Sequence, residues 1–186
     1  MLIIISLVSV EAGGLLFLAQ RFTSIPVGII GGNLSRVFIG EAPERMRRGE
    51  LFSFTRRLMT WLFLGALPFA AIAVVVALNT PREWLASEWA STLWYFAILV
   101  PGALIQLAVV PVSTVLILRN MQFIAMCLQL SGLCLQVGAV LTGHYSRLFD
   151  PIEGFAIGMA LHYAIYAIVV LFVARAPIEP APNQQM

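Results

Sequence analysis

The sequence predicts an all-α protein, a polytopic membrane helix bundle with about five transmembrane helices and part of another before them. Composition is the first reason: of the 186 residues, 60% are hydrophobic and 11% are charged, and the mean hydropathy is +0.93. A soluble domain has about 25% charged residues. A chain of this length has no soluble interior large enough for so much apolar surface. The second reason is that the apolar residues form runs of about 20 residues, the length that crosses a bilayer.

Four runs contain no Asp, Glu, Lys or Arg, namely 58–78, 89–118, 120–142 and 154–174, and a fifth, 12–35, is apolar except for Arg21. Residues 2–10 are also apolar. At about 1.5 Å per residue they reach only about half of a 30 Å hydrocarbon core. We therefore predict that residues 1–11 end a partial transmembrane helix and that residues 12–174 form one helical bundle.

The basic residues predict the orientation, because basic loops stay on the cytoplasmic side. All eleven are arginines. If the loop after 12–35 is cytoplasmic, that side holds Arg36, Arg45, Arg47, Arg48, Arg56, Arg57, Arg119 and Arg175, and the other side holds Arg82 and Arg147. The C-terminus is then cytoplasmic, and the proline-containing tail 175–186 is predicted to be disordered.

The loop 41–57 carries mixed charges and then becomes amphipathic. Leu51, Phe54, Leu58 and Trp61 follow a 3-4-3 spacing with Arg56 and Arg57 on the opposite face. This pattern predicts a helix that lies in the cytoplasmic headgroups before it enters the bilayer. Its role is either that of a positive-inside anchor or that of recruiting a headgroup or substrate.

Arg21 is the one ionisable residue well inside a predicted span. It precedes Arg36 by fifteen residues, which is about 22 Å along a helix. A lipid-exposed Arg there costs at least about 2.5–3.5 kcal/mol, so we expect Arg21 to face a cavity or a partner helix. It could attract a phosphate or an acidic sugar. Alternatively, it pairs with a carboxylate on a neighbouring helix or extends towards the outer surface.

The run 120–142 has two distinctive faces. Gln122, Gln129 and Gln136 recur every seven residues and so form a polar stripe. This stripe either makes interhelical hydrogen bonds or lines a hydrated path. The opposite face carries small residues that would allow another helix to approach closely, at Cys127, Ser131, Cys134 and Gly138.

The last run contains Gly154-x-x-x-Gly158, a helix-packing pattern, followed by His162 and Tyr166 one turn apart. His162 is either hydrogen-bonded structure or a proton relay. In the run 89–118, Gln106 lies between Pro101 and Pro111. Prolines at such positions free backbone carbonyls and kink helices that line cavities, although ordinary kinks are equally common.

No residue pattern of an enzyme is present. The sequence has two histidines, no pair of carboxylates within a span, no phosphate-binding glycine loop and no metal-spaced Cys and His cluster. We therefore predict that the protein is not an enzyme and has no metal or cofactor. The net charge of +2 and the placement of the basic residues in loops argue against nucleic acid as a partner.

Several short motifs occur in a characteristic order. They are Ala12-Gly13, Ala19-Gln20-Arg21-Phe22, Pro26, Val37-Phe38, the Arg-rich loop before Leu58, Glu88-Trp89, Pro101, Gln106, Pro111, Arg119 and Glu153-Gly154. In this order the chain resembles the C-terminal half of the Wzx-type O-antigen flippases. These are polysaccharide biosynthesis proteins of the multidrug/oligosaccharidyl-lipid/polysaccharide exporter superfamily. The family usually has a Gly before the Trp and another before the basic turn, where this chain has Ala86, Ser87 and Leu118.

The resemblance implies a partial transporter that moves a lipid-linked oligosaccharide or polysaccharide precursor, such as that of lipopolysaccharide, across the bacterial inner membrane. Such proteins rock two similar bundles around a central cavity. The chain would therefore need its missing N-terminal bundle or a second copy. The implied partners are membrane lipid and a polyprenyl-pyrophosphate-linked glycan. The candidate substrate-path residues are Arg21, Gln106, Gln129, Gln136, His162 and Tyr166, with His162 as a possible ion-coupling group.

Two other functions remain open at this stage. One is a multidrug or lipid II exporter of the same superfamily. The other is a non-transporting membrane subunit that packs on a partner through Gly154, Gly158 and the small-residue face of 120–142.

Overall fold

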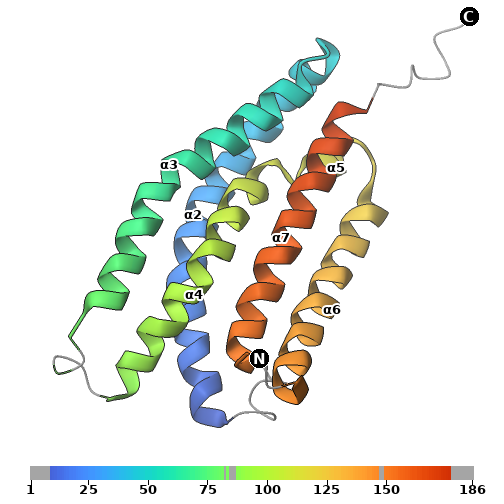
Figure 1. The fold of residues 1–186 in the computed structure, drawn as a ribbon. Coiled ribbons are helices and arrows are strands. Elements are labelled where there is room, and N and C mark those ends of the chain that lie inside the picture. The colour runs from blue at the N-terminus through green and yellow to red at the C-terminus, as the bar shows by residue number, and fades with distance from the viewer. Residues whose placement is uncertain (1–8, 82, 84–86, 147–148, 177–186) are drawn as a thin grey trace, which may run out of the picture.

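The computed structural model describes residues 9–81, 83, 87–146 and 149–176, which form helices and, within these ranges, no strand (Figure 1). The elements are α2 (Val10–Arg47), α3 (Leu51–Asn79), α4 (Ser87–Val109), the 3-10 turn η2 (Val110–Val112), α5 (Val115–Leu118), α6 (Gln122–Ser146) and α7 (Pro151–Arg175). The predicted all-α fold is confirmed. The predictions for residues 1–8 and for the tail from 177 onwards lie outside the described residues.

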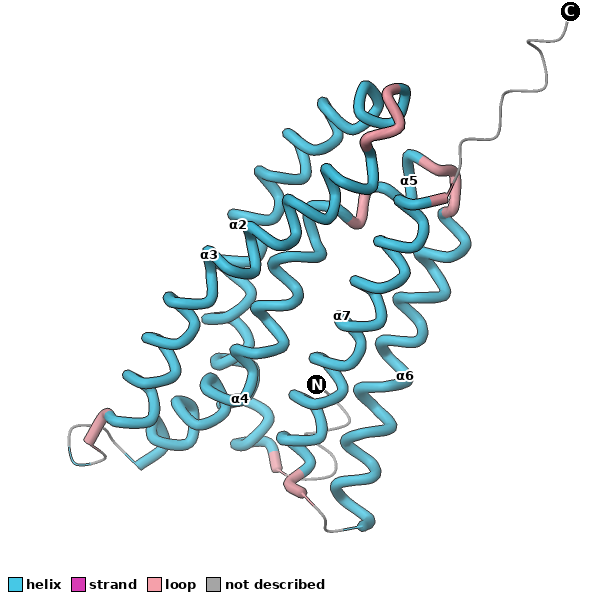
Figure 2. The backbone as a smooth tube through the Cα atoms, turned by 45° about the horizontal axis from the view of Figure 1, so that its top comes forward, coloured by secondary structure: helices cyan, strands magenta, loops and turns pink. Residues whose placement is uncertain are grey.

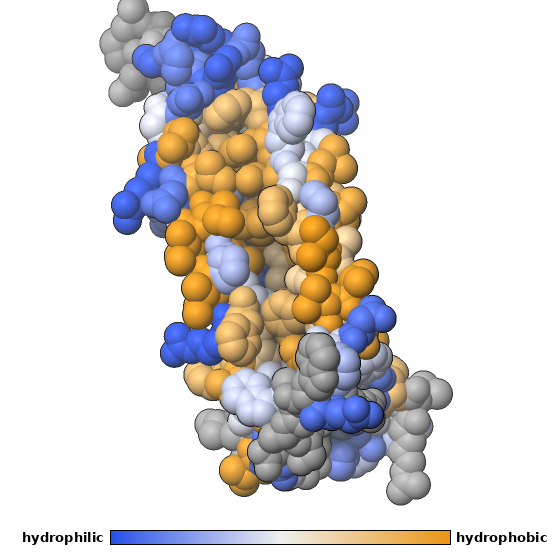
Figure 3. Space-filling model, turned by 90° about the vertical axis from the view of Figure 1, so that its left-hand side faces the viewer, coloured by the Kyte–Doolittle hydropathy of each residue, from blue (hydrophilic) through white to orange (hydrophobic). Residues whose placement is uncertain are grey.

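The helices form a bundle in which α4 is central. It contacts α2, α3 and α7, whereas α6 lies at the edge and packs on α7. Figure 2 shows α6 and α7 side by side along their whole length. Within the described residues, five helices are long and apolar enough to cross a membrane. Figure 3 shows a broad hydrophobic middle with hydrophilic side chains gathered at both ends. By length and composition, these helices are compatible with a multi-pass membrane protein.

Helix α2 is much longer than the predicted span 12–35. The Ser9 hydroxyl accepts a hydrogen bond from the Ala12 backbone N–H at 3.0 Å and so caps its start. At about 1.5 Å per residue, its 38 residues cover about 57 Å, well beyond a 30 Å core. Ion pairs such as Arg45–Glu41, four residues apart, stabilise the charged extension. The helix thus continues beyond the predicted apolar span because these charged residues pair within it.

The charged segment after α2 is a tight helical hairpin, not a helix lying in the headgroups. Gly49 adopts a φ of +72°, which glycine tolerates, and the Glu50 N–H donates to the Arg45 carbonyl at 2.8 Å. Leu51 is 2% exposed, and the Phe54 ring stacks on Phe38 with centroids 5.3 Å apart. Leu51 and Phe54 thus pack towards α2, whereas Trp61 on the same face is exposed. The expectation of a separate interfacial helix was wrong because residues 51–57 continue into the long helix α3 without a break.

The predicted span 89–118 is one crossing made of three pieces. Helix α4 continues through Pro101 and ends at Val109, and the 3-10 turn η2 then contains Pro111. Proline lacks a backbone donor and so weakens helical hydrogen bonding. The short α5 follows. The Arg119 guanidinium after it donates to the Ala176 carbonyl at 2.7 Å, which ties this turn to the end of α7.

The basic groups gather at one end of the bundle. In Figure 1 the α2–α3 hairpin, α5 and the C-terminal end of α7 all lie at the upper end. These segments carry most of the arginines assigned above to one side, among them Arg45, Arg47, Arg48, Arg119 and Arg175. Arg82 and Arg147, predicted for the other side, lie outside the described residues.

Candidate functional site

The interface between α6 and α7 depends on glycines, as the Gly154-x-x-x-Gly158 pattern predicts. A Cβ added at Gly154 would lie 2.5 Å from the Ala139 carbonyl oxygen. A Cβ added at Gly158 would lie 2.9 Å from the Cα atom of Gln136. Both partners are backbone atoms of α6, which cannot move independently. The packing role predicted for the two glycines is confirmed.

The face of α6 that meets α7 is not the small-residue face predicted from the sequence. Cys127 and Cys134 are exposed, and nothing lies within 4 Å of a Cβ added at Gly138. The buried face instead contains Leu128, Gly132, Val140 and Gly143. No described helix packs on the predicted small-residue face, and α7 packs instead where Gly132 accommodates the His162 ring.

His162 lies in this interface, and Tyr166, one turn later on α7, is also buried. His162 is 3% exposed, and a Cβ added at Gly132 would lie 2.6 Å from its ring. The centroid of the His162 ring is 4.9 Å from that of Tyr163 and 5.8 Å from that of Tyr166. Its Nδ1 atom is buried and makes no hydrogen bond in the described part of the chain. Packing, not hydrogen bonding, holds this ring.

The sequence reasoning missed Gly132 and Tyr163. For Gly132 a signal existed, because an isolated glycine inside an apolar helix usually has a packing reason. No comparable pattern marks Tyr163.

The three candidate glutamines occupy different environments. Gln106 on α4 and Gln136 on α6 are half-buried, whereas Gln129 is exposed. None of them makes a side-chain hydrogen bond within the described residues, so the predicted interhelical bonds are not found there. The backbone of Gln136 lies against Gly158 of α7. Gly158 precedes His162 by one helical turn. The structure thus places Gln136 and His162 in the interface between α6 and α7.

Arg21 is on the exposed side of α2. The buried residues Ala19, Thr23 and Val27 define the inner face of this helix, and Arg21 lies on the other side. Its guanidinium lies over the Phe17 ring, 5.3 Å from the centroid, and no carboxylate of the described residues pairs with it. The described part of the chain therefore provides neither the cavity nor the partner helix that the sequence led us to expect.

The same exposed side of α2 carries two glycines among larger residues such as Ile25 and Ile29. Nothing lies within 4 Å of a Cβ added at Gly28 or Gly32, whereas one added at Gly31 would lie 3.0 Å from Val110. Gly28 follows Arg21 by seven residues and so lies on the same side of the helix. An open strip with a single cation thus runs along α2.

In the described ranges, no group of three His, Cys, Asp or Glu side chains could hold a metal ion. An apolar cavity of about 230 Å³ between α2, α3 and α4 offers Thr23 as a polar group but no charge. No family model, curated protein or solved structure matches the chain.

Proposed function

We propose that this chain is one helical bundle of a transporter that moves a lipid-linked glycan precursor across a bacterial inner membrane. The basic end and the C-terminus face the cytoplasm in this proposal. The observation that carries it is Arg21, which lies at membrane depth on a side of α2 that the described chain leaves uncovered. An arginine that faces lipid there costs at least about 2.5–3.5 kcal/mol. A second bundle with a cavity between the two would remove that cost.

The shape of the same side of α2 supports a second bundle. The space above Gly28 and Gly32 is open, and small residues at this spacing let helices approach closely. Arg21 would then lie in the wall of the cavity. A guanidinium binds phosphate oxygens in a bidentate manner, which suits the pyrophosphate of a polyprenyl-linked glycan.

The order of motifs along the chain also favours this proposal. It resembles one half of the O-antigen flippases, which work by rocking two bundles against each other. The second bundle would be another bundle of the same transporter or a second copy of this chain. No bond of the substrate is broken, so the activity is not enzymatic. Gln129, exposed on α6, would add a hydrogen-bonding group where that helix faces the second bundle.

Replacing Arg21 with Ala in the native bacterium is expected to abolish display of the surface polysaccharide, while the protein stays in the membrane. The lost charge-assisted contact is worth about 1.5–3 kcal/mol, roughly ten- to a hundredfold in transport. Polysaccharide on whole cells and protein in isolated membranes are the two measurements. Arg36→Ala, an exposed arginine at the basic end of the same helix, is the matched control and should leave display intact. Unchanged display in Arg21→Ala would contradict the proposal.

The phenotype of Arg21→Ala also distinguishes the proposed function from the alternative ones. Loss of resistance to cationic drugs would indicate a multidrug exporter, and arrest of cell-wall synthesis a lipid II exporter. A non-transporting subunit is favoured by the uncovered strip on α2 and the exposed Cys127 face of α6. It would purify with an unrelated partner in equal amount and would lose that partner when Gly28 is replaced by Leu.

A further inference from the structure

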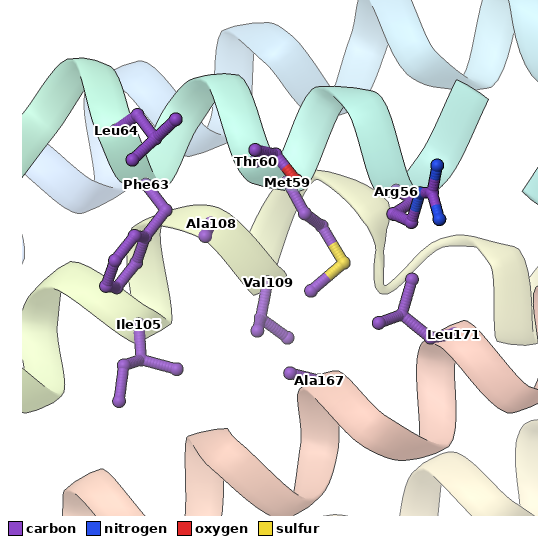
Figure 4. A pocket seen from close by; sticks show the side chains of 10 residues that line it. All are labelled: Arg56, Met59, Thr60, Phe63, Leu64, Ile105, Ala108, Val109, Ala167 and Leu171. Carbon is purple, nitrogen blue, oxygen red and sulfur yellow. The ribbon is translucent and has the colours of Figure 1, made fainter. Parts of the chain in front are cut away.

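A second feature of the bundle is a groove of about 250 Å³ between α3, α4 and α7 (Figure 4). Its lining is almost entirely apolar and includes Met59, Phe63, Ile105, Val109, Ala167 and Leu171. The small Ala108 and Ala167 leave the space that larger side chains would fill. The groove opens on the surface of the protein, since Thr60 and Leu64 along its edge are exposed.

The groove reaches from the level of the headgroups into one leaflet. Its lining on α3 extends from Arg56 to Leu64, nine residues that cover about 12 Å of helix. Half of a 30 Å hydrocarbon core is about 15 Å. Arg56 stands two residues before the charge-free run 58–78, so it lies at the level of the lipid headgroups on the basic side of the bundle.

Arg56 carries a positive charge that the described residues do not neutralise. Arg45, Arg47 and Arg48 of the nearby hairpin all pair with glutamates. The Arg56 guanidinium instead lies over the Phe52 ring, 5.7 Å from the centroid, and has no carboxylate partner in the described ranges. One turn further along the groove, Thr60 supplies a hydroxyl group.

An apolar groove that reaches into one leaflet, with an uncompensated guanidinium at its headgroup end, is complementary to a lipid with a negative headgroup. Guanidinium groups bind phosphate in a bidentate manner, and basic residues at this depth attract anionic lipids. The geometry points to a binding site for one anionic phospholipid, with an acyl chain in the groove and its phosphate on Arg56 and Thr60. This inference does not rest on the transporter proposal, because α2 and Arg21 contribute nothing to the groove.

The test measures binding of phosphatidylglycerol and phosphatidylcholine to the purified full chain in mild detergent, with bound species resolved by native mass spectrometry. The wild-type chain is expected to retain one phosphatidylglycerol about tenfold more tightly than phosphatidylcholine. Arg56→Gln should remove that preference. Arg57→Gln is the matched control, because Arg57 is the next residue, is also exposed and lines a different cavity with Arg45 and Glu50. It should bind as the wild type does.

A second variant tests the contribution of the groove to lipid binding independently of the Arg56 charge. Ala167→Phe leaves every charge in place but fills the groove, so it should also lose the bound lipid. Circular dichroism and elution volume show whether each variant folds. Equal weakening by Arg56→Gln and Arg57→Gln, or equal affinity for the two lipids, would overturn the inference. A dimer that buries the groove and excludes lipid would also overturn it. The outcome is independent of the Arg21 experiment, since each variant leaves the other site unchanged.

Discussion

Replacing Gly158 with Leu is expected to lower the free energy of unfolding by about 3 kcal/mol, because overpacking a close helix contact costs that order of energy. The first atom of the new side chain would already lie 2.9 Å from the Cα atom of Gln136 and 3.0 Å from the Leu135 carbonyl oxygen. Helices α6 and α7 must then separate. Because α6 lies at the edge of the bundle with α7 as its main neighbour, no other helix compensates for the lost contact.

The matched control is the same substitution at Gly138, where nothing lies within 4 Å of an added Cβ. Leu is about 0.8 kcal/mol more favourable than Gly inside a helix, so Gly138→Leu should cause no loss. Reversible unfolding of both variants in detergent measures the difference. Equal stability of the two would mean that α6 and α7 do not pack through Gly158.

The sequence predicts the number of long helices well, because crossing a membrane demands about 20 apolar residues and charges interrupt such runs. It predicts helix ends less well. The charged residues after Ser35 form ion pairs within the helix and so extend α2 to Arg47. The pairing of Phe54 with Phe38 buries an amphipathic face that an isolated segment would offer to the membrane.

Which side of a helix is covered also depends on its neighbours. The small-residue pattern on α6 suggested Cys127 and Gly138, yet α7 packs where Gly132 accommodates the His162 ring. Arg21 shows the opposite case. Its residue type and position in the span predicted a cavity or a partner helix beside it, but the described chain contains neither. The groove beside Arg56 could not be predicted at all, because its lining comes from three helices far apart in sequence.

The contact between Gly132 and His162 predicts a change of sign in a double-mutant cycle. In the wild-type background, Gly132→Ala is expected to cost about 1–2 kcal/mol of stability, since the new Cβ would lie 2.6 Å from a ring that Tyr163 and Tyr166 hold in place. His162→Ala should cost about 2 kcal/mol because it leaves a cavity. In the His162→Ala background, the cavity receives the methyl group of Gly132→Ala.

In the His162→Ala background, Gly132→Ala should therefore stabilise the protein, because Ala is more favourable than Gly in a helix by up to about 1 kcal/mol. The coupling energy between the two sites would reach about 2 kcal/mol, within the range for residues in direct contact. The coupling energy is obtained from the free energies of unfolding, in the same detergent, of the wild type, both single variants and the double variant. An equal loss in both backgrounds would show that the His162 ring does not occupy the space above Gly132. Such a result would leave the ring free to serve as a proton-transfer group, whereas strong coupling identifies it as a packing element between α6 and α7.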